Sequence, residues 1–207
     1  MKMTAFDRKS HWEHIYQHKK PKEVSWYQPI PHLALDFIRE INLPETARFI
    51  DVGGGDSYLA DHLLDLGYHD ITVLDISEHS IKKAQERLGK KAQKVKWIVS
   101  DIVDFKPFEK YDFWNDRAAF HFLTEESEIM NYIRITEEAL SDSGYLLIST
   151  FSESGPLKCS GIPIHQYAAK TLQKKFASFK SLGCKEVDHN TPFGTQQNFT
   201  SCRFQKI

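Results

Sequence analysis

A glycine-rich turn between two apolar strands constrains the fold of this chain more than any other feature. Residues 49–58 read Phe-Ile-Asp-Val-Gly-Gly-Gly-Asp-Ser-Tyr, and residues 71–76 read Ile-Thr-Val-Leu-Asp-Ile. The consecutive glycines allow the backbone to bend sharply and to approach a ligand that side chains would block; they are Gly53, Gly54 and Gly55. Asp75 follows Gly53 by 22 residues, close to the separation at which an acid in a βαβ unit meets ribose hydroxyls. The pattern predicts strand, turn, helix and strand around an adenosine-containing ligand.

The rest of the chain alternates between predicted strands and predicted helices. Strands are expected at 48–52, 71–74, 95–99, 111–114 and 145–150, and helices at 10–18, 30–41, 57–66, after Ser77, after Thr124 and at 169–179. This alternation implies an α/β fold with a parallel sheet and helices on both faces. Strand-like runs at 184–190 and 197–204, separated by a Pro-Phe-Gly turn, predict an antiparallel hairpin at the end of the sheet. We expect a single domain over 1–207, in which 1–44 form an N-terminal helical arm or lid.

Composition excludes several classes of function. The chain has 207 residues and 41% hydrophobic residues, enough for one substantial core. A formal net charge of −1 argues against a general nucleic-acid binder, which normally carries a basic surplus. No apolar run approaches the roughly 18 residues that span a bilayer, and Met1–Arg8 lacks the apolar core of a secretion signal. We therefore expect no nucleic-acid or membrane partner, and a monomer or homodimer.

The cysteines are few, odd in number and far apart: Cys159, Cys184 and Cys202. This spacing predicts neither a disulfide framework nor a cysteine metal site, and it favours a reducing, cytoplasmic location. We expect no bound metal.

Three cofactor classes use a glycine turn after a first strand. A Walker loop ends in Gly-Lys-Ser/Thr, but Gly55 is followed by Asp56 and Ser57, so bound phosphate would meet an acid and no lysine. A dinucleotide site wants a further glycine three residues after Gly55, and that position is Tyr58. S-adenosyl-L-methionine fits better, because acids at three successive strand ends suit one long cationic ligand.

Each of these acids has a predicted partner on that cofactor. Asp51 is expected to accept from the ammonium group, and Asp75 to hold both ribose hydroxyls in a charge-assisted, bidentate arrangement. Asp101 is expected to accept from the adenine amino group, while Ile76 and Ile102 clamp the ring faces. The alternative interpretation is that each carboxylate caps a helix or a turn.

These residues resemble the class I S-adenosylmethionine-dependent methyltransferases. The family pattern is Asp/Glu-x-Gly-x-Gly-x-Gly, which stands here as Asp51, Gly53, Gly55 and Ser57, with serine at the third glycine. The resemblance runs from Phe49 to Phe204 and implies a Rossmann-like, doubly wound seven-stranded sheet, mostly parallel with a C-terminal antiparallel hairpin. The predicted cofactor-binding residues are Trp26, Tyr27, Asp51, Gly53, Gly54, Gly55, Tyr58, Asp75, Ile76, Ser77, Asp101, Ile102 and Asn115.

Methyl transfer is an in-line displacement, so the protein must align the reactants, exclude water and leave a lone pair on the acceptor. Aromatic faces near a sulfonium bind it by cation–π attraction. Trp26 and Tyr27, on the arm, are the candidates for such a lid. The alternative is that they only pack the arm against the domain.

In this family the acceptor site lies past the fourth strand, where this chain reads Asn115-Asp-Arg-Ala118. Methylases of exocyclic amino groups in DNA usually show Asn/Asp-Pro-Pro-Tyr/Phe there, so that class is disfavoured. The Asp-Arg pair resembles the thiopurine methyltransferase branch, whereas Glu23–Gln28 resembles proteins related to the citrate-synthase lysine methyltransferase. The predicted catalytic residues are Asp116, Arg117 and His121.

His121 would accept a proton, its unperturbed pKa being about 6.5, and Arg117 would hold a substrate carboxylate. The alternative is a structural Asp116–Arg117 network with a core histidine. The long segment 151–167, with Cys159 and His165, is interpreted as a specificity loop over the acceptor; the role of these two residues stays open.

The predicted function is transfer of a methyl group from S-adenosyl-L-methionine to a sulfur, nitrogen or oxygen atom of a small molecule. One alternative is a protein-lysine methyltransferase, for which an acidic rim near Asp116, Glu125 and Glu126 is expected. A second alternative is a non-catalytic module that binds the cofactor. The sequence does not identify the acceptor.

Overall fold

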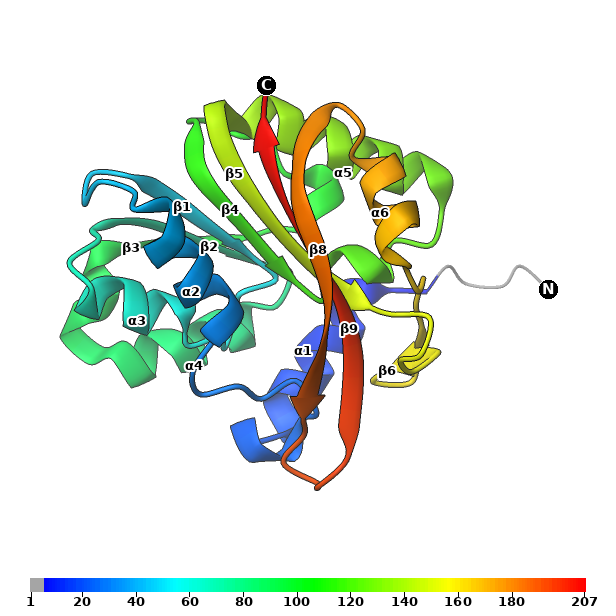
Figure 1. Cartoon of the computed structure of the whole chain (residues 1–207). Helices are drawn as coiled ribbons and strands as arrows, with labels where there is room; N and C mark the ends of the chain where they lie inside the picture. Colours follow the sequence, from blue (N-terminus) through cyan, green and yellow to red (C-terminus); the bar gives the residue numbers. More distant parts are fainter. Residues whose placement is uncertain (1–5) are drawn as a thin grey trace.

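The computed structural model describes residues 6–207, so residues 1–5, part of both the presumed arm and the segment tested as a secretion signal, lie outside the described residues. Within that range the chain forms a seven-stranded sheet in the order β3-β2-β1-β4-β5-β9-β8 (Figure 1). Its strands are β1 Arg48–Val52, β2 Asp70–Asp75, β3 Val95–Val99, β4 Tyr111–Arg117, β5 Leu140–Phe151, β8 Phe179–Asn190 and β9 Gln196–Lys206. Strands β1 to β5 pair in parallel, and β9 is antiparallel to both β5 and β8. The predicted Rossmann-like α/β fold is confirmed.

Helices cover both faces of this sheet (Figure 1). They are α1 Arg8–His18, α2 His32–Ile41, α3 Leu59–Asp65, α4 Glu78–Leu88, α5 Glu126–Ala139 and α6 Ala169–Lys175, with short 3-10 turns η1 Pro21–Glu23, η2 Gly89–Lys94, η3 Ile102–Asp104 and η4 Phe120–Phe122. Strand β4 illustrates the two layers, because successive side chains of a strand point to opposite faces. Phe113 packs with α2 and α3, and Trp114 packs with α5. Both side chains are fully buried, as expected for a central parallel strand.

Of the two helix caps that the sequence predicts, one is confirmed and the other is displaced by one residue. Ser77 caps α4 as predicted, since its hydroxyl accepts from the amide of Ser80. The cap predicted at Thr124 is wrong by one residue: Glu125 is the N-cap of α5. Helix α6 ends at Lys175, four residues earlier than expected, and the chain then enters β8 at Phe179.

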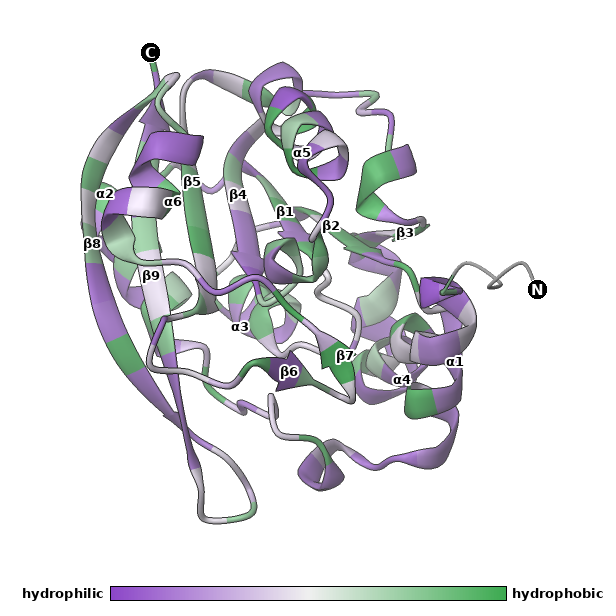
Figure 2. Ribbon diagram, turned by 90° about the vertical axis from the view of Figure 1, so that its right-hand side faces the viewer, coloured by the Kyte–Doolittle hydropathy of each residue, from purple (hydrophilic) through white to green (hydrophobic). Residues whose placement is uncertain are grey.

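The terminal hairpin corrects the expectation for the cysteines. Cys184 on β8 pairs opposite Cys202 on β9, and the two form a disulfide. The sequence did not reveal this pairing, because the two residues lie 18 positions apart and their register depends on an irregularity between Ser181 and Gly183. Strand β8 is the edge of the sheet and is mostly hydrophilic, in contrast to β5 (Figure 2).

The segment 151–167 holds a short antiparallel pair, β6 Lys158–Cys159 and β7 Ile162–Pro163. Across residues 6–207, none of the helices combines the length and the apolar character that a bilayer crossing requires.

Candidate active site

The glycine turn after β1 brings backbone rather than side chains to the carboxyl edge of the sheet. Gly53 has a φ of +66°, and its amide donates to the carbonyl of Leu74 on β2 at 2.8 Å. A Cβ atom on Gly54 would stand 2.5 Å from Oδ2 of Asp51, and one on Gly53 would stand 2.8 Å from Cβ of Ala119. Glycine is therefore required at both positions, and the turn leaves a surface that a ligand can approach closely.

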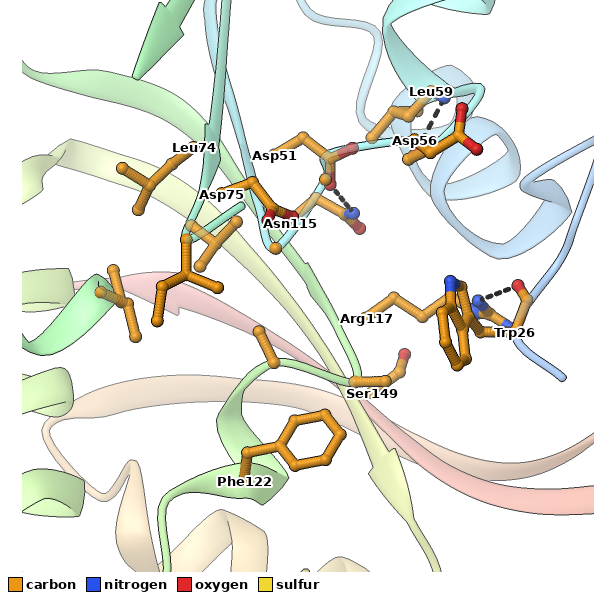
Figure 3. Close-up of a pocket in the computed structure, with 18 of the residues that line it drawn as sticks. Trp26, Asp51, Asp56, Leu59, Leu74, Asp75, Asn115, Arg117, Phe122 and Ser149 are labelled. Carbon is orange, nitrogen blue, oxygen red and sulfur yellow. Dashed lines mark hydrogen bonds between the residues drawn. The ribbon is translucent and has the colours of Figure 1, made fainter. Parts of the chain in front are cut away.

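A pocket runs along this edge, and most of the predicted cofactor residues line it (Figure 3). Those in its wall are Trp26, Tyr27, Asp51, Gly53, Gly54, Asp75, Ile76, Asp101, Ile102 and Asn115. The strand ends of β1, β2 and β4 thus bring together residues that are up to 64 positions apart in the sequence, as Asp51 and Asn115 are.

Asp51 is a buried acid with one carboxylate oxygen left unsatisfied by the described residues. Its side chain is buried, and Oδ1 accepts from Nδ2 of Asn115 at 2.6 Å. Oδ2 has no hydrogen-bond partner among residues 6–207. Burial raises the pKa of Asp51 from its ordinary 3.8 to about 6. A buried carboxylate oxygen without a partner is costly, so an ammonium group placed here would relieve that cost. The residues fit the amino-acid end of S-adenosylmethionine.

Asp75 and Asp101 each stabilise a turn and also line the pocket, so both interpretations of these acids, as caps and as cofactor ligands, stay possible at once. Asp75 accepts from the amides of Gly55 (2.9 Å) and Ser77 (2.8 Å), so it organises the turn while lining the pocket. Burial raises the pKa of Asp75 to about 6. Each of its oxygens has a second lone pair for a ribose hydroxyl. Asp101 caps η3 through the amide of Val103 and also lines the pocket.

Arg8 on α1 is a pocket residue that sequence reasoning missed. Its Nε lies 3.3 Å from Oδ2 of Asp101, and its Nη1 donates to Glu128 on α5 at 3.2 Å. Glu13, also on α1, accepts from the amides of Glu78 and His79 at the start of α4. Helix α1 is therefore held beside Asp101 and beside the start of α4. Both lie at the end of the pocket where the nucleoside of the cofactor is expected to bind. The sequence predicts the helix but holds no local signal for where it docks.

Three predicted cofactor residues support the pocket without appearing in its wall among the described residues: Gly55, Tyr58 and Ser77. The Gly55 amide holds Asp75, and Ser77 is the buried cap of α4. The Tyr58 ring lies under the guanidinium of Arg87 at 4.1 Å.

The other end of the pocket is built from Trp12, Trp26, Arg117, Ala118, Phe122, Ser149 and Cys159, and we call it the acceptor end. Figure 3 shows Arg117 reaching toward Trp26, away from the group of Asp51, Asp75 and Asn115. The ring of Trp12 packs edge-on against those of Trp26 and Phe122, with distances between ring centres of 5.7 and 5.0 Å. Burial raises the pKa of the Cys159 thiol to about 11.

Arg117 is the charged residue of this end. Its Nη1 donates to the carbonyl of Trp26 on the arm at 3.0 Å. Its Nη2 is buried and without a hydrogen-bond partner in the part of the chain that the structure describes. Burial lowers the pKa of Arg117 to about 10, so the guanidinium stays charged at neutral pH.

Asp116 and His121 lie outside the pocket wall, in the core beneath it. Asp116 accepts from the amides of Ala119 and Phe120 and from the hydroxyl of Tyr132. Nδ1 of His121 accepts from the amide of Phe151, and burial lowers the pKa of His121 to about 3. These positions match the structural alternative, and they give no support to the catalytic role that we predicted for the two residues.

The loop residues Cys159 and His165 separate in the structure. Cys159 lines the pocket, whereas the ring of His165 stacks on Tyr167 at 4.4 Å. Within residues 6–207, no group of three or more histidine, cysteine or acidic side chains is placed to hold a metal ion.

The chain is similar in sequence to known methyltransferases. A family described as methyltransferase domains matches residues 44–204. The eEF1A lysine and N-terminal methyltransferase of Mus musculus is 26% identical over 144 residues, which are 69% of this chain and 20% of the mouse protein. The malonyl-[acyl-carrier protein] O-methyltransferase of Anoxybacillus flavithermus is 29% identical over 116 residues, 56% of this chain and 42% of that protein. The chain thus spans about a fifth to two fifths of the length of these relatives.

Among solved structures, the 1,6-didemethyltoxoflavin-N1-methyltransferase of Burkholderia thailandensis, crystallised with S-adenosylhomocysteine, superposes with a TM-score of 0.74. The match covers 96% of this chain and 86% of that one at 14% identity, so it speaks for the fold. The family match covers most of the chain and includes the glycine turn and the acids of the pocket. The chain therefore belongs to the methyltransferase-domain family.

Proposed function

We propose that the protein methylates a sulfur, nitrogen or oxygen atom of a small molecule. The observation that carries this proposal is the continuity of the pocket, which joins the acids at the strand ends to an end enclosed by aromatic rings. The ring centre of Trp12 lies 5.7 Å from that of Trp26 and 5.0 Å from that of Phe122. Such walls suit a flat, compact acceptor.

In this proposal the chain binds and orients rather than reacting covalently. S-adenosylmethionine, when bound, supplies the electrophilic methyl carbon. Asp51 holds the ammonium group, Asp75 the ribose, and Asp101 with Arg8 the adenine end. Trp26 and Tyr27 exclude water from the sulfonium and attract it through their ring faces. Within the predicted arm, 1–44, helix α2 packs into the core. The described residues before α2 then act as the part that closes over the pocket, with Trp26 fixed by Arg117.

The lysine alternative receives less support from the charges. Of the three residues expected to form an acidic rim, Asp116 is fully buried. Glu126 pairs with Lys175 at 2.6 Å, on the surface. Neither these two nor Glu125 is in the pocket wall as the described residues form it. The charged side chain of the acceptor end is Arg117, which repels a lysine ammonium. The lysine methyltransferase named among the relatives keeps this alternative open to test.

Transfer of tritium from labelled S-adenosylmethionine separates the candidates. The purified protein is incubated with a metabolite pool and, separately, with a cell lysate. Label in small molecules supports the proposal, and label in protein bands supports the lysine alternative. Cofactor binding without any transfer supports a non-catalytic module.

A cytoplasmic location and a monomeric or homodimeric state are further proposals from the sequence. Cell fractionation tests the first, and it bears on Cys184 and Cys202 because cytoplasmic thiols are kept reduced. Light scattering tests the second.

A further inference from the structure

The acceptor end offers no group that would remove a proton from the acceptor. Among the described residues in its wall there is no carboxylate and no imidazole. The hydroxyl of Ser149 donates to Ser201 at 2.9 Å, and burial keeps the Cys159 thiol protonated by raising its pKa. Neither side chain is a base at neutral pH.

The bases nearest in the sequence are unavailable. His121 lies beneath the pocket, where Nδ1 accepts from the amide of Phe151 and Nε2 is buried without a partner among residues 6–207; burial and the charge of Arg117 lower the pKa of the ring to about 3, too low for a base at neutral pH. The carboxylate of Asp116 is used by η4 and by Tyr132. Of the carboxylates that do line the pocket, Asp56 pairs with Arg87, and the others lie at the cofactor end.

The acceptor end also carries a positive charge, on Arg117, that has an unsatisfied hydrogen-bond donor among residues 6–207. Arg117 reaches the wall from the end of β4, donates once to the arm and leaves Nη2 buried without a partner in residues 6–207. Its guanidinium is buried and lies 5.2 Å from the ring of Phe199, and the nearby carboxylate that acts on its charge is Asp51, which raises the pKa of Arg117 against the larger effect of burial. A charge in such surroundings exerts a stronger field than one in water.

We propose that the acceptor enters this pocket already ionised at the atom that attacks. Its class is an anionic sulfur or oxygen nucleophile on a flat ring, and Arg117 selects the anion. This inference rests on the proposed small-molecule function and narrows it. A lone pair of the anion forms the new bond to the methyl carbon, and the bond from that carbon to the sulfonium sulfur breaks. Both electrons stay on that sulfur, and no proton is transferred, so no protein base is needed.

A neutral amine is a poorer acceptor for this site than an anion, because its methylation produces a cation. Its attack leaves a cation on nitrogen beside Arg117, where like charges repel. With no base in the wall to take the extra proton, the product stays charged inside the pocket. Attack by an anion leaves a neutral product, which suits surroundings formed by Trp12, Trp26 and Phe122.

Four probes that share one benzene ring test the inference: thiophenol, benzoate, phenol and aniline. Binding to the protein saturated with S-adenosylhomocysteine is measured by calorimetry, and methyl transfer is followed with the labelled cofactor. We expect benzoate and thiophenolate to bind about tenfold or more tightly than phenol and aniline. The thiophenol and benzoate arms tell a sulfur acceptor from a carboxylate acceptor. Binding of neither anion, or equal binding of aniline, overturns the inference, whereas the tritium assay decides the proposed function independently.

The pH profile supplies a second readout. For thiophenol, kcat/KM is expected to rise with pH and to level off above the pKa of the thiol itself. With the more acidic 4-nitrothiophenol the inflection moves down with the thiol. The cofactor is kept saturating at every pH, so that the titration of Asp51 does not enter the profile. Under that condition an inflection that stays at one pH for both thiols would reveal a protein base and contradict the inference.

Arg117→Gln is the matching variant, and Arg203→Gln is its control. Arg203 on β9 lies over Phe37 at 4.6 Å and pairs with Glu40, outside the pocket wall. We expect Arg117→Gln to lose about tenfold or more in benzoate affinity, and to lose less S-adenosylhomocysteine affinity than benzoate affinity, because Arg117 also holds Trp26 of the arm. Arg117→Lys keeps the charge and should retain the preference for anions, which covers the case in which the glutamine variant fails to fold. Unchanged benzoate binding in a folded Arg117→Gln protein would refute the role of Arg117.

Discussion

Asp51→Asn is expected to make the ligand-free protein more stable while weakening its hold on the cofactor. The substitution keeps the shape of the side chain and the hydrogen bond from Asn115, which then reaches an amide oxygen. It removes a charge whose Oδ2 has no partner among the described residues. The pKa of Asp51 rises from 3.8 to about 6 because the carboxyl is buried. This difference between the ordinary and the buried pKa corresponds to roughly 3 kcal/mol.

The sign of this contribution follows from proton binding. Between pH 3.8 and about 6 the folded protein holds the proton of Asp51 more tightly than the unfolded chain. The contribution of this group to stability therefore falls as pH rises through that window, and its full cost is present above it. We expect Asp51→Asn to raise the free energy of unfolding by about 1–3 kcal/mol at pH 7.5, with the gain vanishing in acid below pH 3.8.

Cofactor affinity should move in the other direction. The variant presents an amide in place of the free carboxylate oxygen, so the ammonium of S-adenosylhomocysteine loses a charge-assisted contact. We expect affinity to fall about tenfold or more at pH 7.5. In the unsubstituted protein the affinity should also decline as the pH drops through about 6, the pKa of Asp51 in the empty pocket, and the variant should lack this dependence.

Urea denaturation of the ligand-free protein and calorimetry with S-adenosylhomocysteine measure the two effects. Asp65→Asn is the control, because Asp65 is exposed on α3 and pairs with Lys91. An Asp51→Asn protein that is less stable than the parent and binds the ligand equally well would refute the reasoning.

Three further results are expected. Gly54→Ala places a Cβ 2.5 Å from Oδ2 of Asp51, so calorimetry should show loss of S-adenosylhomocysteine binding; retained affinity would mean that the turn has room to spare. His121→Asn should make the protein less sensitive to acid. Burial lowers the pKa of His121 to about 3, so the parent protein loses stability as the pH falls below about 6.5, by roughly 2 kcal/mol at pH 5. Urea denaturation at pH 7.5 and pH 5 measures this loss, and an equal loss in parent and variant would contradict the prediction. Glu13→Ala removes the acceptor at the start of α4, so α1 should exchange its amide hydrogens faster and S-adenosylhomocysteine should bind more weakly; unchanged affinity would mean that α1 does not belong to the site.

The cofactor end could be predicted from the sequence because its signals are local. Asp51, Gly53 and Gly54 lie within a few residues of one another, and Asp75 and Asp101 each follow an apolar strand. Parallel strands bring their carboxyl ends to one edge, so the acids must meet there. That inference needs no knowledge of side-chain packing.

Predicting the acceptor end correctly depends on the alternation of side chains along β4. Asn115 and Arg117 line the pocket, and Asp116 between them faces Tyr132 on α5, as the period of a strand demands. The period alone excludes Asp116 and Arg117 from sharing one face. The position of His121 depends on Ala118, whose φ of +71° turns the chain into η4. Such a conformation is uncommon for alanine and leaves no mark in the sequence.

Long-range docking accounts for the other differences. Arg8 and Trp12 reach the pocket because α1 packs across the edge of the sheet, and Cys184 meets Cys202 because β9 inserts between β5 and β8. Periodicity describes each element by itself. It does not specify which surfaces of distant elements come together.

The most direct measurement is a crystal structure of the protein with S-adenosylhomocysteine. We expect the amino group on Oδ2 of Asp51, the ribose hydroxyls on Asp75 and the thioether sulfur at the junction with the acceptor end. A nucleoside bound elsewhere, or one in this crevice whose amino group avoids Asp51, would contradict this expectation.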